Sequence, residues 1–496
     1  MINLKELLQS YYIDSSGPLS LPIRQFSLHS AVPNENGVFF CRSGRRDGLD
    51  FVEEAIDNGA ICIIATDPAL LDKQKDFPDT TFLVVSELPS VITILLHTVY
   101  QNVYDDMEFY GVTGTNGKTT VTYMVSTLLN RFGFKTGSVG TEGVMTHDMQ
   151  HLDYHKTTPT TPEAPELARI IRRFHEESYQ SMVFEATSIA LDQKRTDFFP
   201  VDTGIFTNFS RDHIDYHGSI EHYLESKMKL ANAADTLIYS LDEPAFEELH
   251  NKGKPVITFS LKNPEADFYG EQITYNDNGS HFLLYAKGRK YEVYTPFIGE
   301  HNVYNILSAF ALLHHKGVPV QAIAEETAKL PPLRNRFQLV TMCDRRFILD
   351  FAHTPIALEQ SLDVARNLAD GKLIAMVNGI GLRGLDKAQR MSEKIGPAID
   401  EIVLGAEQVG YTEPLDVLQA MQEALPSHVS PHQVTTAESR KEAIAACIER
   451  SSPGDTILLT GINEPQHYKG TLIPHDDLEE ISNYFHSLCP KLKKTI

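Results

Sequence analysis

The sequence predicts an α/β protein of three domains, centred on a parallel P-loop sheet that binds a mononucleotide and carries helices on both faces. Three observations predict this fold class. The chain has 496 residues, too many for one ordinary core. Short apolar strands alternate with amphipathic helices along it. A glycine-rich turn joins a strand to a helix at residues 113–119. We place the domain boundaries near residues 107 and 333.

Composition restricts the classes of partner and compartment. The net charge of −22 argues against nucleic acid and against an anionic membrane surface, because both need clustered Lys and Arg. The five cysteines are scattered without metal-ligand spacing, which fits a reducing compartment. The first apolar run is too short for a signal peptide, and no run of 18 apolar residues occurs. We therefore expect a cytoplasmic, monomeric protein that acts on small molecules.

The first domain, residues 1–107, reads as a small α/β unit. Its loops are rich in Pro, Gly and Asn, and its apolar runs are β-rich. We expect strands at 38–41, 60–64 and 81–85. We expect helices at 51–58 and 91–100.

The central domain, residues 108–333, opens on the glycine-rich turn. The turn reads Thr-Gly-Thr-Asn-Gly-Lys-Thr at 113–119, after an apolar strand at 109–112 and before an amphipathic helix at 121–129. Such a turn presents backbone N–H groups at a helix N-terminus, where a polyphosphate can bind. A glycine turn without a ligand is the alternative. The flanking strand and helix favour binding of a nucleoside triphosphate.

Individual positions in the turn have expected roles. We expect Lys118 to lie on the outer phosphates and the Thr119 hydroxyl to contact Mg²⁺. Val112 stands where the strict P-loop pattern has its first glycine. The motif is therefore a shortened relative of that pattern, built on Gly114 and Gly117.

Polar residues follow two further apolar strands of this domain. Glu185 follows the strand at 181–184, and the segment leading to His213 follows the strand at 204–207. Residues just past the carboxyl ends of parallel strands face the ligand crevice. Glu185 could therefore reach a metal or be a solvated acid, and His213 alone is more often structural. By charge count alone, Lys227 would be a solvated surface lysine.

The rest of the sequence predicts how the central domain ends and what the third domain contains. Short β runs at 256–297 indicate an antiparallel appendage, and a helix at 302–315 closes the central domain. The third domain, residues 334–496, looks like a Rossmann fold but lacks G-x-G-x-x-G. Its expected strands lie at 347–350, 373–377, 401–404 and 456–459, and its expected helices at 356–368 and around 417–424.

Six segments, in order through the central and third domains, resemble the Mur ligases, most closely the MurE type of UDP-N-acetylmuramoyl-dipeptide:amino acid ligase. They are residues 113–119, 160–163, 185–188, 207–218, 299–305 and 350–355. The resemblance implies that the first domain binds a UDP-sugar and that the third binds an amino acid. It also implies amide bond formation driven by ATP cleavage to ADP and phosphate, through an acyl phosphate.

The resemblance further implies a two-metal site. It assigns catalysis to Lys118, Glu185, His213 and Lys227, with ATP and Mg²⁺ as cofactors. Thr119, Glu185 and His213 would be metal ligands. Lys227 matches the family's carbamylated lysine, whose CO₂-derived carboxylate can support a metal where an ammonium would repel it.

The resemblance also assigns the binding contacts. The nucleotide would contact Gly114, Thr115, Asn116, Gly117, Lys118, Thr119, Thr120, Asn302, Asn305, Arg336, Asp350 and His353. The other substrates would contact Thr160, Thr161, Ser188, Arg195, Arg383, Glu407 and Glu464.

Several family motifs are altered here. Leu-His-Ser-Ala-Val at 28–32 replaces an Asp-Ser-Arg near the uridine, and Glu-Gln-Val-Gly at 407–410 replaces the acceptor motif Asp-Asn-Pro with Arg, Ala or Asn after it. Without an arginine at Gly410, the distal carboxylate of meso-diaminopimelate has no obvious partner. Three interpretations stay open: a MurE that adds L-lysine or a similar amino acid, a paralogue that ligates a different amino acid or carboxylate, and a catalytically silent nucleotide-binding regulator.

Overall fold

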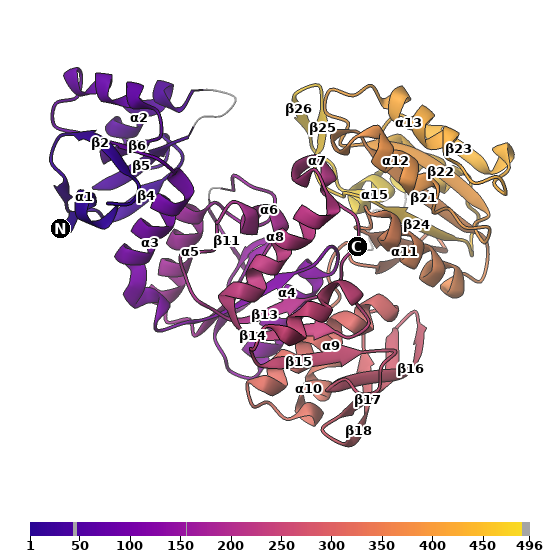
Figure 1. The fold of residues 1–496 in the computed structure, drawn as a ribbon. Helices are drawn as coiled ribbons and strands as arrows, with labels where there is room; N and C mark the ends of the chain where they lie inside the picture. Colours follow the sequence, from indigo (N-terminus) through magenta and orange to yellow (C-terminus); the bar gives the residue numbers. More distant parts are fainter. Residues whose placement is uncertain (43–46, 155, 489–496) are drawn as a thin grey trace. The chain divides into compact units, whose positions relative to one another are not determined.

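The computed structural model describes residues 1–42, 47–154 and 156–488 (Figure 1). The chain divides into two compact units, each of which is described by itself. The first contains residues 1–209, 221–259 and 308–318, and the second contains residues 210–220, 260–307 and the described residues from Pro319 onward. The three-domain division with boundaries near residues 107 and 333 stays a prediction.

The N-terminal part of the first unit is a five-stranded sheet with the order β2-β7-β6-β5-β4. In that order the strands span Tyr12–Ser16, Thr81–Val85, Ala60–Ala65, Gly37–Cys41 and Gln25–Ser27. All pairs are parallel except β2–β7. The three predicted strands are present as β5, β6 and β7. The two predicted helices are α2 (Val52–Asp57) and α3 (Leu88–Tyr104).

The second sheet of this unit carries the glycine-rich turn. Within the unit its order is β11-β10-β9-β12-β8-β13-β14-β15. The strands span, in that order, His151–Leu152, Gly143–Met145, Thr136–Gly140, Ser181–Glu185, Glu108–Thr113, Val201–Phe206, Ala234–Ser240 and Val256–Ser260. The six strands from β9 to β15 are mutually parallel, so their carboxyl ends share one edge. The predicted parallel central sheet is confirmed.

Helices cover the central sheet. They include α4 (Lys118–Arg131), α5 (Ala164–Glu176), α6 (Ser188–Asp192) and α8 (Ile220–Ala233). Apolar residues of α5, α6 and α8 pack in one core with sheet residues that include Phe109 and Phe184. An aromatic cluster lies at the base of β8, where the ring of Phe199 is 4.8 Å from that of Phe109 and 5.3 Å from that of Phe184. This packing fixes β8 and β12, the two strands that lead to the turn and to Glu185.

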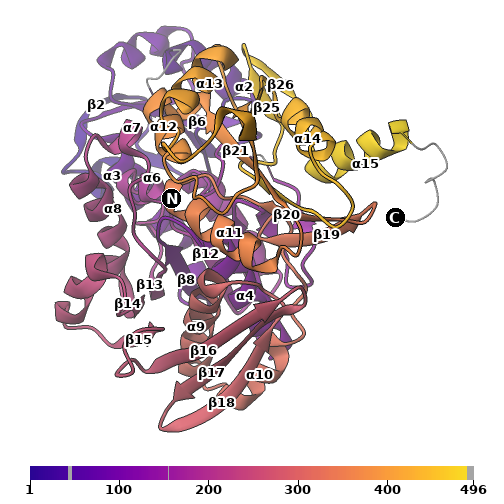
Figure 2. The same ribbon diagram turned by 90° about the vertical axis from the view of Figure 1, so that its right-hand side faces the viewer.

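The second unit contains an antiparallel hairpin array and a mostly parallel sheet. The array is β16 (Phe268–Asn276), β17 (Gly279–Ala286) and β18 (Arg289–Thr295), drawn side by side in Figure 2. The sheet has the order β19-β20-β24-β21-β22-β23, with only β19 antiparallel to its neighbour. Its strands span, in that order, Gln338–Met342, Arg345–Asp350, Thr456–Thr460, Leu373–Ile380, Glu401–Glu407 and Val434–Ala437.

Helices flank this sheet and complete a Rossmann-like arrangement, as predicted. They are α11 (Pro355–Leu368), α12 (Leu385–Ser392), α13 (Pro414–Glu423), α14 (Arg440–Glu449) and α15 (Asp477–Leu488). A small hairpin, β25 (Gln466–Tyr468) with β26 (Thr471–Ile473), follows β24. Helix α9 (Glu300–His315) matches the helix predicted at 302–315. Across the described ranges, no helix is both long enough and apolar enough to cross a membrane.

Candidate active site

The glycine-rich turn leaves β8 at Thr113 and enters α4 at Lys118. Gly114 has φ +144° and Gly117, the residue before the helix, has φ +87°. A Cβ on Gly114 would lie 1.9 Å from Oγ1 of Thr207. Both positions therefore require glycine. The turn delivers the chain into α4 with the N-terminus of the helix at the carboxyl edge of the sheet, where a phosphate group is favoured.

The end of the neighbouring strand β13 holds the turn in place. The N–H of Thr115 donates to the carbonyl of Asn208, and the N–H of Asn116 donates to Oδ1 of the same asparagine, each at 2.9 Å. The Thr207 hydroxyl donates to the carbonyl of Asn116 at 2.6 Å. Sequence reasoning placed Thr207 and Asn208 in a family motif but gave neither a role. The structure makes them the support of the turn.

The Lys118 ammonium lies over the turn. Its Nζ donates to the carbonyls of Gly114 and Thr115, each at 2.9 Å. Thr120, also predicted to contact the nucleotide, is buried in the first turn of α4. A cation held at the start of this helix is suited to neutralise the outer phosphates of a nucleotide.

Glu185 ends β12, directly beside β8, and is buried at 1% exposure. Its Oε2 accepts a hydrogen bond from the Thr119 hydroxyl at 3.1 Å, and its Oε1 accepts from the N–H of Thr141 at 2.8 Å. A carboxylate and a hydroxyl are the hard oxygen donors that Mg²⁺ prefers. The pair Thr119 and Glu185 therefore fits the predicted metal. A buried carboxylate also needs such compensation for the water that it has lost.

Strand β9 makes room for that carboxylate. A Cβ on Gly140, the last residue of β9, would lie 2.2 Å from Oε1 of Glu185. Sequence reasoning missed β9 and Gly140, because the Thr-Gly-Ser-Val-Gly sequence has a weak strand signal.

Lys227 lies on α8 and is buried at 1% exposure, unlike a solvated surface lysine. Its Nζ donates to the carbonyl of Gly114 at 2.7 Å and lies 4.4 Å from the centre of the Tyr223 ring. A buried ammonium is costly unless it is compensated. A lysine at this depth that points at the phosphate turn fits the predicted carbamate, which converts the cation into an oxygen-donor group.

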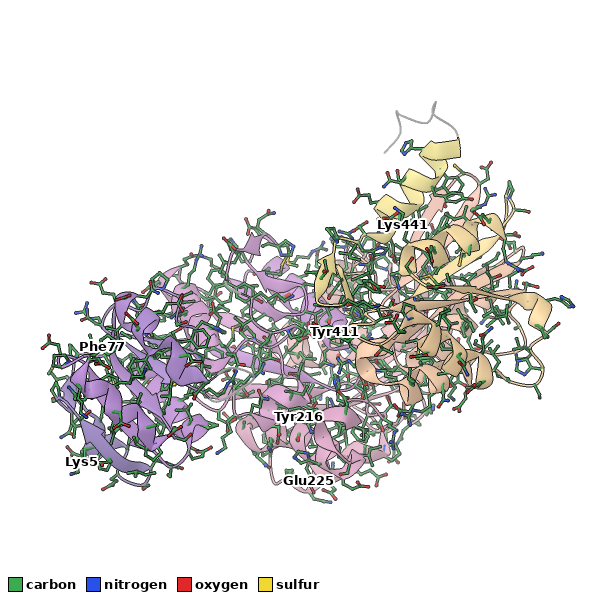
Figure 3. The ribbon with its side chains drawn as sticks, turned by 90° about the horizontal axis from the view of Figure 1, so that it is seen from above. Lys5, Phe77, Tyr216, Glu225, Tyr411 and Lys441 are labelled. Atoms are coloured by element: carbon green, nitrogen blue, oxygen red, sulfur yellow. The ribbon has the colours of Figure 1, made fainter. Side chains whose placement is uncertain are left out.

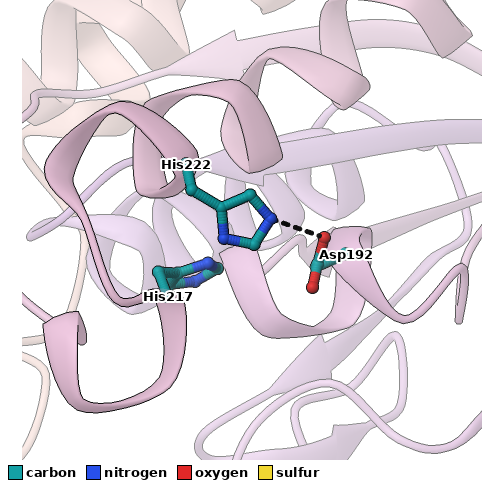
Figure 4. Close-up of side chains that lie close together, drawn as sticks. All are labelled: Asp192, His217 and His222. Atoms are coloured by element: carbon teal, nitrogen blue, oxygen red, sulfur yellow. Dashed lines mark ion pairs between the residues drawn. The ribbon is translucent and has the colours of Figure 1, made fainter.

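The carboxylate of Asp192, at the end of α6, links α6 to α8. Its Oδ1 lies 2.7 Å from Nζ of Lys229 and 3.4 Å from Nε2 of His222, the ion pair drawn in Figure 4. The Ser226 hydroxyl donates to the same oxygen at 3.5 Å. These contacts set the rotation of α8 about its axis, so that Lys227 on the opposite side is directed at the turn.

Three predicted substrate contacts gather beside Glu185. The Thr161 hydroxyl donates to the main-chain carbonyl of Glu185 at 2.6 Å, and the Thr160 hydroxyl lies 3.1 Å from that of Thr141. Arg195 NH1 donates to the carbonyl of Thr161 at 2.8 Å. The structure therefore brings these residues together at the strand edge. Ser188, also predicted, is the first residue of α6 and is buried.

In the second unit, His213 lies in a charged cluster. Nδ1 of His213 accepts a hydrogen bond from NH1 of Arg383 at 2.9 Å, and its Nε2 lies 3.5 Å from Oδ2 of Asp212. Lys387 donates to Oδ1 of Asp212 at 2.7 Å, and Nε2 of His353 lies 3.8 Å from Oδ2. Asp212 contacts His213, Lys387 and His353 and so lies at the centre of this cluster. Sequence reasoning assigned it no role, because nothing in the sequence links residue 212 to residues 353 and 387.

Burial and charge shift the pKa values in this cluster. Burial alone would raise the pKa of Asp212, but Lys387, His213 and His353 together hold it well below its usual range. Burial, followed by Lys387, lowers the pKa of His353 from 6.5 to about 3. Asp212 is therefore a carboxylate at neutral pH and His353 is uncharged.

The remaining predicted nucleotide contacts of this unit are largely buried. Asn302 donates to the carbonyl of Ile298 at 2.9 Å, and Asn305 donates to Oδ1 of Asn302 at 3.2 Å. These bonds fix both amides on one side of α9.

Asp350 is the last residue of β20, and Arg336 lies shortly before β19. Oδ1 of Asp350 accepts from the N–H of Phe337 at 3.2 Å, and its Oδ2 accepts from the Ser361 hydroxyl. The Arg336 guanidinium stacks on the Phe351 ring at 4.3 Å. Both residues are thus fixed by neighbours within the second unit.

Glu407 lies in a buried ion cluster. Its Oε2 is 2.5 Å from NH1 of Arg440, and its Oε1 accepts from the N–H of Ile462 at 2.9 Å. Arg440 also donates to both oxygens of Asp477, at 2.8 and 2.6 Å. Both oxygens of Glu407 are therefore engaged inside the fold. Glu464, the other predicted acceptor contact, is exposed.

Two segments of the chain match models of known protein families. Residues 112–313 match the Mur ligase middle domain, and residues 335–463 match the Mur ligase, glutamate ligase domain. The chain is 31% identical to UDP-N-acetylmuramoyl-L-alanyl-D-glutamate--2,6-diaminopimelate ligase 2 of Clostridium acetobutylicum, over 97% of this chain and 99% of that protein. It is also 31% identical to UDP-N-acetylmuramyl-tripeptide synthetase 2 of Oceanobacillus iheyensis, over 96% and 97%.

Solved structures show the same fold. One is a UDP-N-acetylmuramoyl-L-alanyl-D-glutamate--2,6-diaminopimelate ligase, with a TM-score of 0.65 and 23% identity over 98% of this chain and 99% of that one. Another is the MurF ligase of Thermotoga maritima in complex with ADP, with a TM-score of 0.67 and 17% identity over 94% and 97%.

Proposed function

Because this chain belongs to the Mur ligase family, it is an ATP-dependent ligase that forms amide bonds, and we propose that it joins an amino acid to UDP-N-acetylmuramoyl-L-alanyl-D-glutamate in peptidoglycan synthesis. The names of the two relatives support this carboxylate substrate, since one is a ligase of that dipeptide and the other a tripeptide synthetase. The observation that carries the proposal is the assembly of Lys118, Glu185 and Lys227 around one phosphate turn.

The proposed reaction has two steps. An oxygen of the peptide carboxylate attacks the γ-phosphorus of ATP, and ADP leaves, so that an acyl phosphate forms. The amine nitrogen of the amino acid then attacks the acyl carbon, phosphate leaves with the C–O bonding pair, and the nitrogen loses a proton. The first step brings two anions together, and the second develops negative charge on the oxygen of a tetrahedral intermediate, so both need fixed positive charge where negative charge develops.

The residues of the turn supply that charge. Lys118 neutralises the outer phosphates, while Thr119 and Glu185 would hold one Mg²⁺. Mg²⁺ would supply charge neutralisation between the carboxylate and the γ-phosphate. Lys227, as its carbamate, would support a metal ion at the turn. For His213, in the second unit, the role of metal ligand stays a prediction from the resemblance. Thr160, Thr161 and Arg195 would orient the peptide substrate at the strand edge.

We propose L-lysine or a similar amino acid as the acceptor. Gly410 has φ +62°, and a Cβ there would lie 2.3 Å from Cδ2 of Leu382. A long cationic side chain at this position would be strained and would displace Leu382. The absence of an arginine at this position supports an acceptor without a distal carboxylate. Tyr411, the next residue, is 81% exposed (Figure 3).

A paralogue that ligates a different amino acid is the second candidate. The segment at 407–410, which replaces the acceptor motif, forms hydrogen bonds within the protein. The Gln408 amide donates to the carbonyl of Pro465 at 3.0 Å and accepts from the N–H of His467 at 3.1 Å. These bonds attach the loop to hairpin β25–β26 and leave the side chain of Gln408 engaged away from any ligand.

The test is phosphate release by the purified full-length protein with ATP, Mg²⁺, UDP-N-acetylmuramoyl-L-alanyl-D-glutamate and a panel of amino acids. We expect release with L-lysine and much less with meso-diaminopimelate. Release with another amino acid alone would favour the paralogue. If ATP binds but no amino acid gives phosphate, the proposed dipeptide substrate is wrong, which would favour a paralogue that uses a different carboxylate substrate or a silent nucleotide-binding regulator.

Lys227→Ala tests the metal-supporting role. We expect turnover to fall by about 10²–10³-fold, since removing one charge-stabilising group from an active site has effects of that order. A short carboxylic acid added to the assay should restore part of the activity by replacing the carbamate. Lys252→Ala, at an exposed lysine beyond α8, is the matched control. Unchanged turnover in Lys227→Ala would show that Lys227 does not support a metal ion.

A further inference from the structure

We propose that Tyr223 is a positioning residue that acts on the phosphate turn through its hydroxyl and on Lys227 through its ring. This inference rests on the proposed function, since it concerns the carbamate of Lys227. Tyr223 lies on α8 four residues before Lys227, so the two side chains share one face of the helix. It is 1% exposed, in contact with the turn.

The hydroxyl of Tyr223 reaches the middle of the turn. It lies 3.2 Å from Oγ1 of Thr115, within hydrogen-bond distance. The carbonyl of Thr115 accepts a hydrogen bond from Lys118, and its N–H donates to Asn208. The Tyr223 hydroxyl therefore contacts Thr115, whose carbonyl also accepts a hydrogen bond from Lys118. Its loss would loosen the part of the turn that meets the nucleotide, without removing any group that contacts the nucleotide directly.

The ring of Tyr223 forms one wall around the Lys227 nitrogen. Nζ lies 4.4 Å from the ring centre, and the carbonyl of Gly114 contacts it at 2.7 Å. The ring of Phe209 packs against the Tyr223 ring at 5.3 Å, which limits movement of the wall. With Lys227 at 1% exposure, the ring keeps bulk water from the nitrogen.

Exclusion of water matters for the chemistry of Lys227. The unprotonated amine adds to CO₂, a nitrogen–carbon bond forms, and the nitrogen releases a proton to leave a carbamate anion. The reverse reaction needs a proton on that nitrogen, followed by loss of CO₂. A dry aromatic wall limits the approach of water that would carry this proton. The ring of Tyr223 therefore stabilises the modified lysine, a role separate from that of the hydroxyl.

Two substitutions separate these roles. Tyr223→Phe keeps the ring and removes the hydroxyl. We expect the Kd for ATP to rise about fivefold, the effect of one hydrogen bond. Its carbamate signal, measured by carbon-13 NMR in labelled bicarbonate, should match that of the wild type.

Tyr223→Leu removes the ring as well. We expect the bicarbonate concentration that gives half of the carbamate signal to rise about tenfold or more, with partial recovery at high bicarbonate. If this variant unfolds, Tyr223→Met keeps more of the volume without the ring and carries the same expectation. Tyr100 supplies the matched controls, because it is a buried tyrosine whose hydroxyl donates to the carbonyl of Arg24 at 2.9 Å, far along the sequence from the turn. Tyr100→Phe and Tyr100→Leu should change neither quantity.

The outcomes are distinguishable from a failure of the proposed function, because neither readout requires turnover. Loss of ATP affinity and of carbamate in equal measure in Tyr223→Phe and Tyr223→Leu would indicate general packing and overturn the inference. Unchanged values in both variants would overturn it too. A wild-type protein that forms the carbamate yet releases no phosphate with any amino acid would contradict the ligase proposal and leave the positioning role supported by its own measurements.

Discussion

At the scale of single residues, burial decides how the charged groups behave. Lys227 is the clearest example, because its charge and its place on a polar helix predict a surface lysine, yet it is buried against the phosphate turn. Only the motif resemblance pointed to its role. The motif positions could be predicted because they are local in sequence. The partners Asp212, Tyr223 and Arg440 could not, since each meets groups that lie far away along the chain.

The charged cluster around Asp212, which includes His353, predicts a pH dependence of stability. The pKa of His353 is lowered to about 3, so below pH 6.5 the unfolded chain binds a proton that the folded chain does not. The free energy of unfolding should therefore fall as the pH drops from about 6.5 toward 3. Because the His353 side chain is 21% exposed, we expect a loss of about 1–3 kcal/mol at pH 4 rather than the full value.

Denaturant unfolding of the wild type and of His353→Gln between pH 7 and pH 4 measures this contribution. The variant cannot take up that proton, so its stability should decline less over this interval. Asp212 adds its own loss only at lower pH, because it is a carboxylate whose pKa is depressed. Parallel curves for the two proteins would contradict the assignment of a neutral, half-buried His353.

At the scale of elements, long apolar strands and amphipathic helices could be predicted, and short or glycine-rich strands could not. The strand at 181–184 and the helix at 356–368 match β12 and α11 within one residue at each end. Strand β9 was missed because two of its five residues are glycine. Those glycines have a packing reason, since a Cβ on Gly137 would lie 2.4 Å from the Phe174 ring and one on Gly140 would meet Glu185.

Gly140→Ala should therefore disturb the metal site without changing any charge. The added methyl group must push the Glu185 carboxylate away from Thr119 and from the N–H of Thr141. We expect the Mg²⁺ concentration that gives half-maximal turnover to rise about tenfold or more, equal to the loss of roughly 1.4 kcal/mol of binding.

Magnesium titration of the ligase reaction measures this shift. Gly396→Ala is the control, because a Cβ there has no atom within 4 Å among the described residues. A normal magnesium requirement in Gly140→Ala would mean that Glu185 does not hold the ion.

At the scale of the whole molecule, the net charge follows directly from the sequence. A net charge of −22 on 496 residues favours repulsion between copies in solution. The number of α/β sheets and the parallel centre were also predictable, because alternating strands and helices leave few arrangements. The interleaving of the two units was not, since it depends on contacts between distant segments.

We predict a monomer. Sedimentation equilibrium at physiological ionic strength should give a mass near 55.6 kDa at all loading concentrations. A mass that rises toward twice that value with concentration would show that self-association overcomes the charge repulsion.

The interleaving bears on how the protein is made. The first unit takes in residues 308–318, which are synthesised after a long stretch that belongs to the second. During translation, this unit must wait for Val318 to leave the ribosome before it can close. Until then its sheets, whose strands are all synthesised by Ser260, lack the packing of residues 308–318, and chaperones act on such unfinished forms.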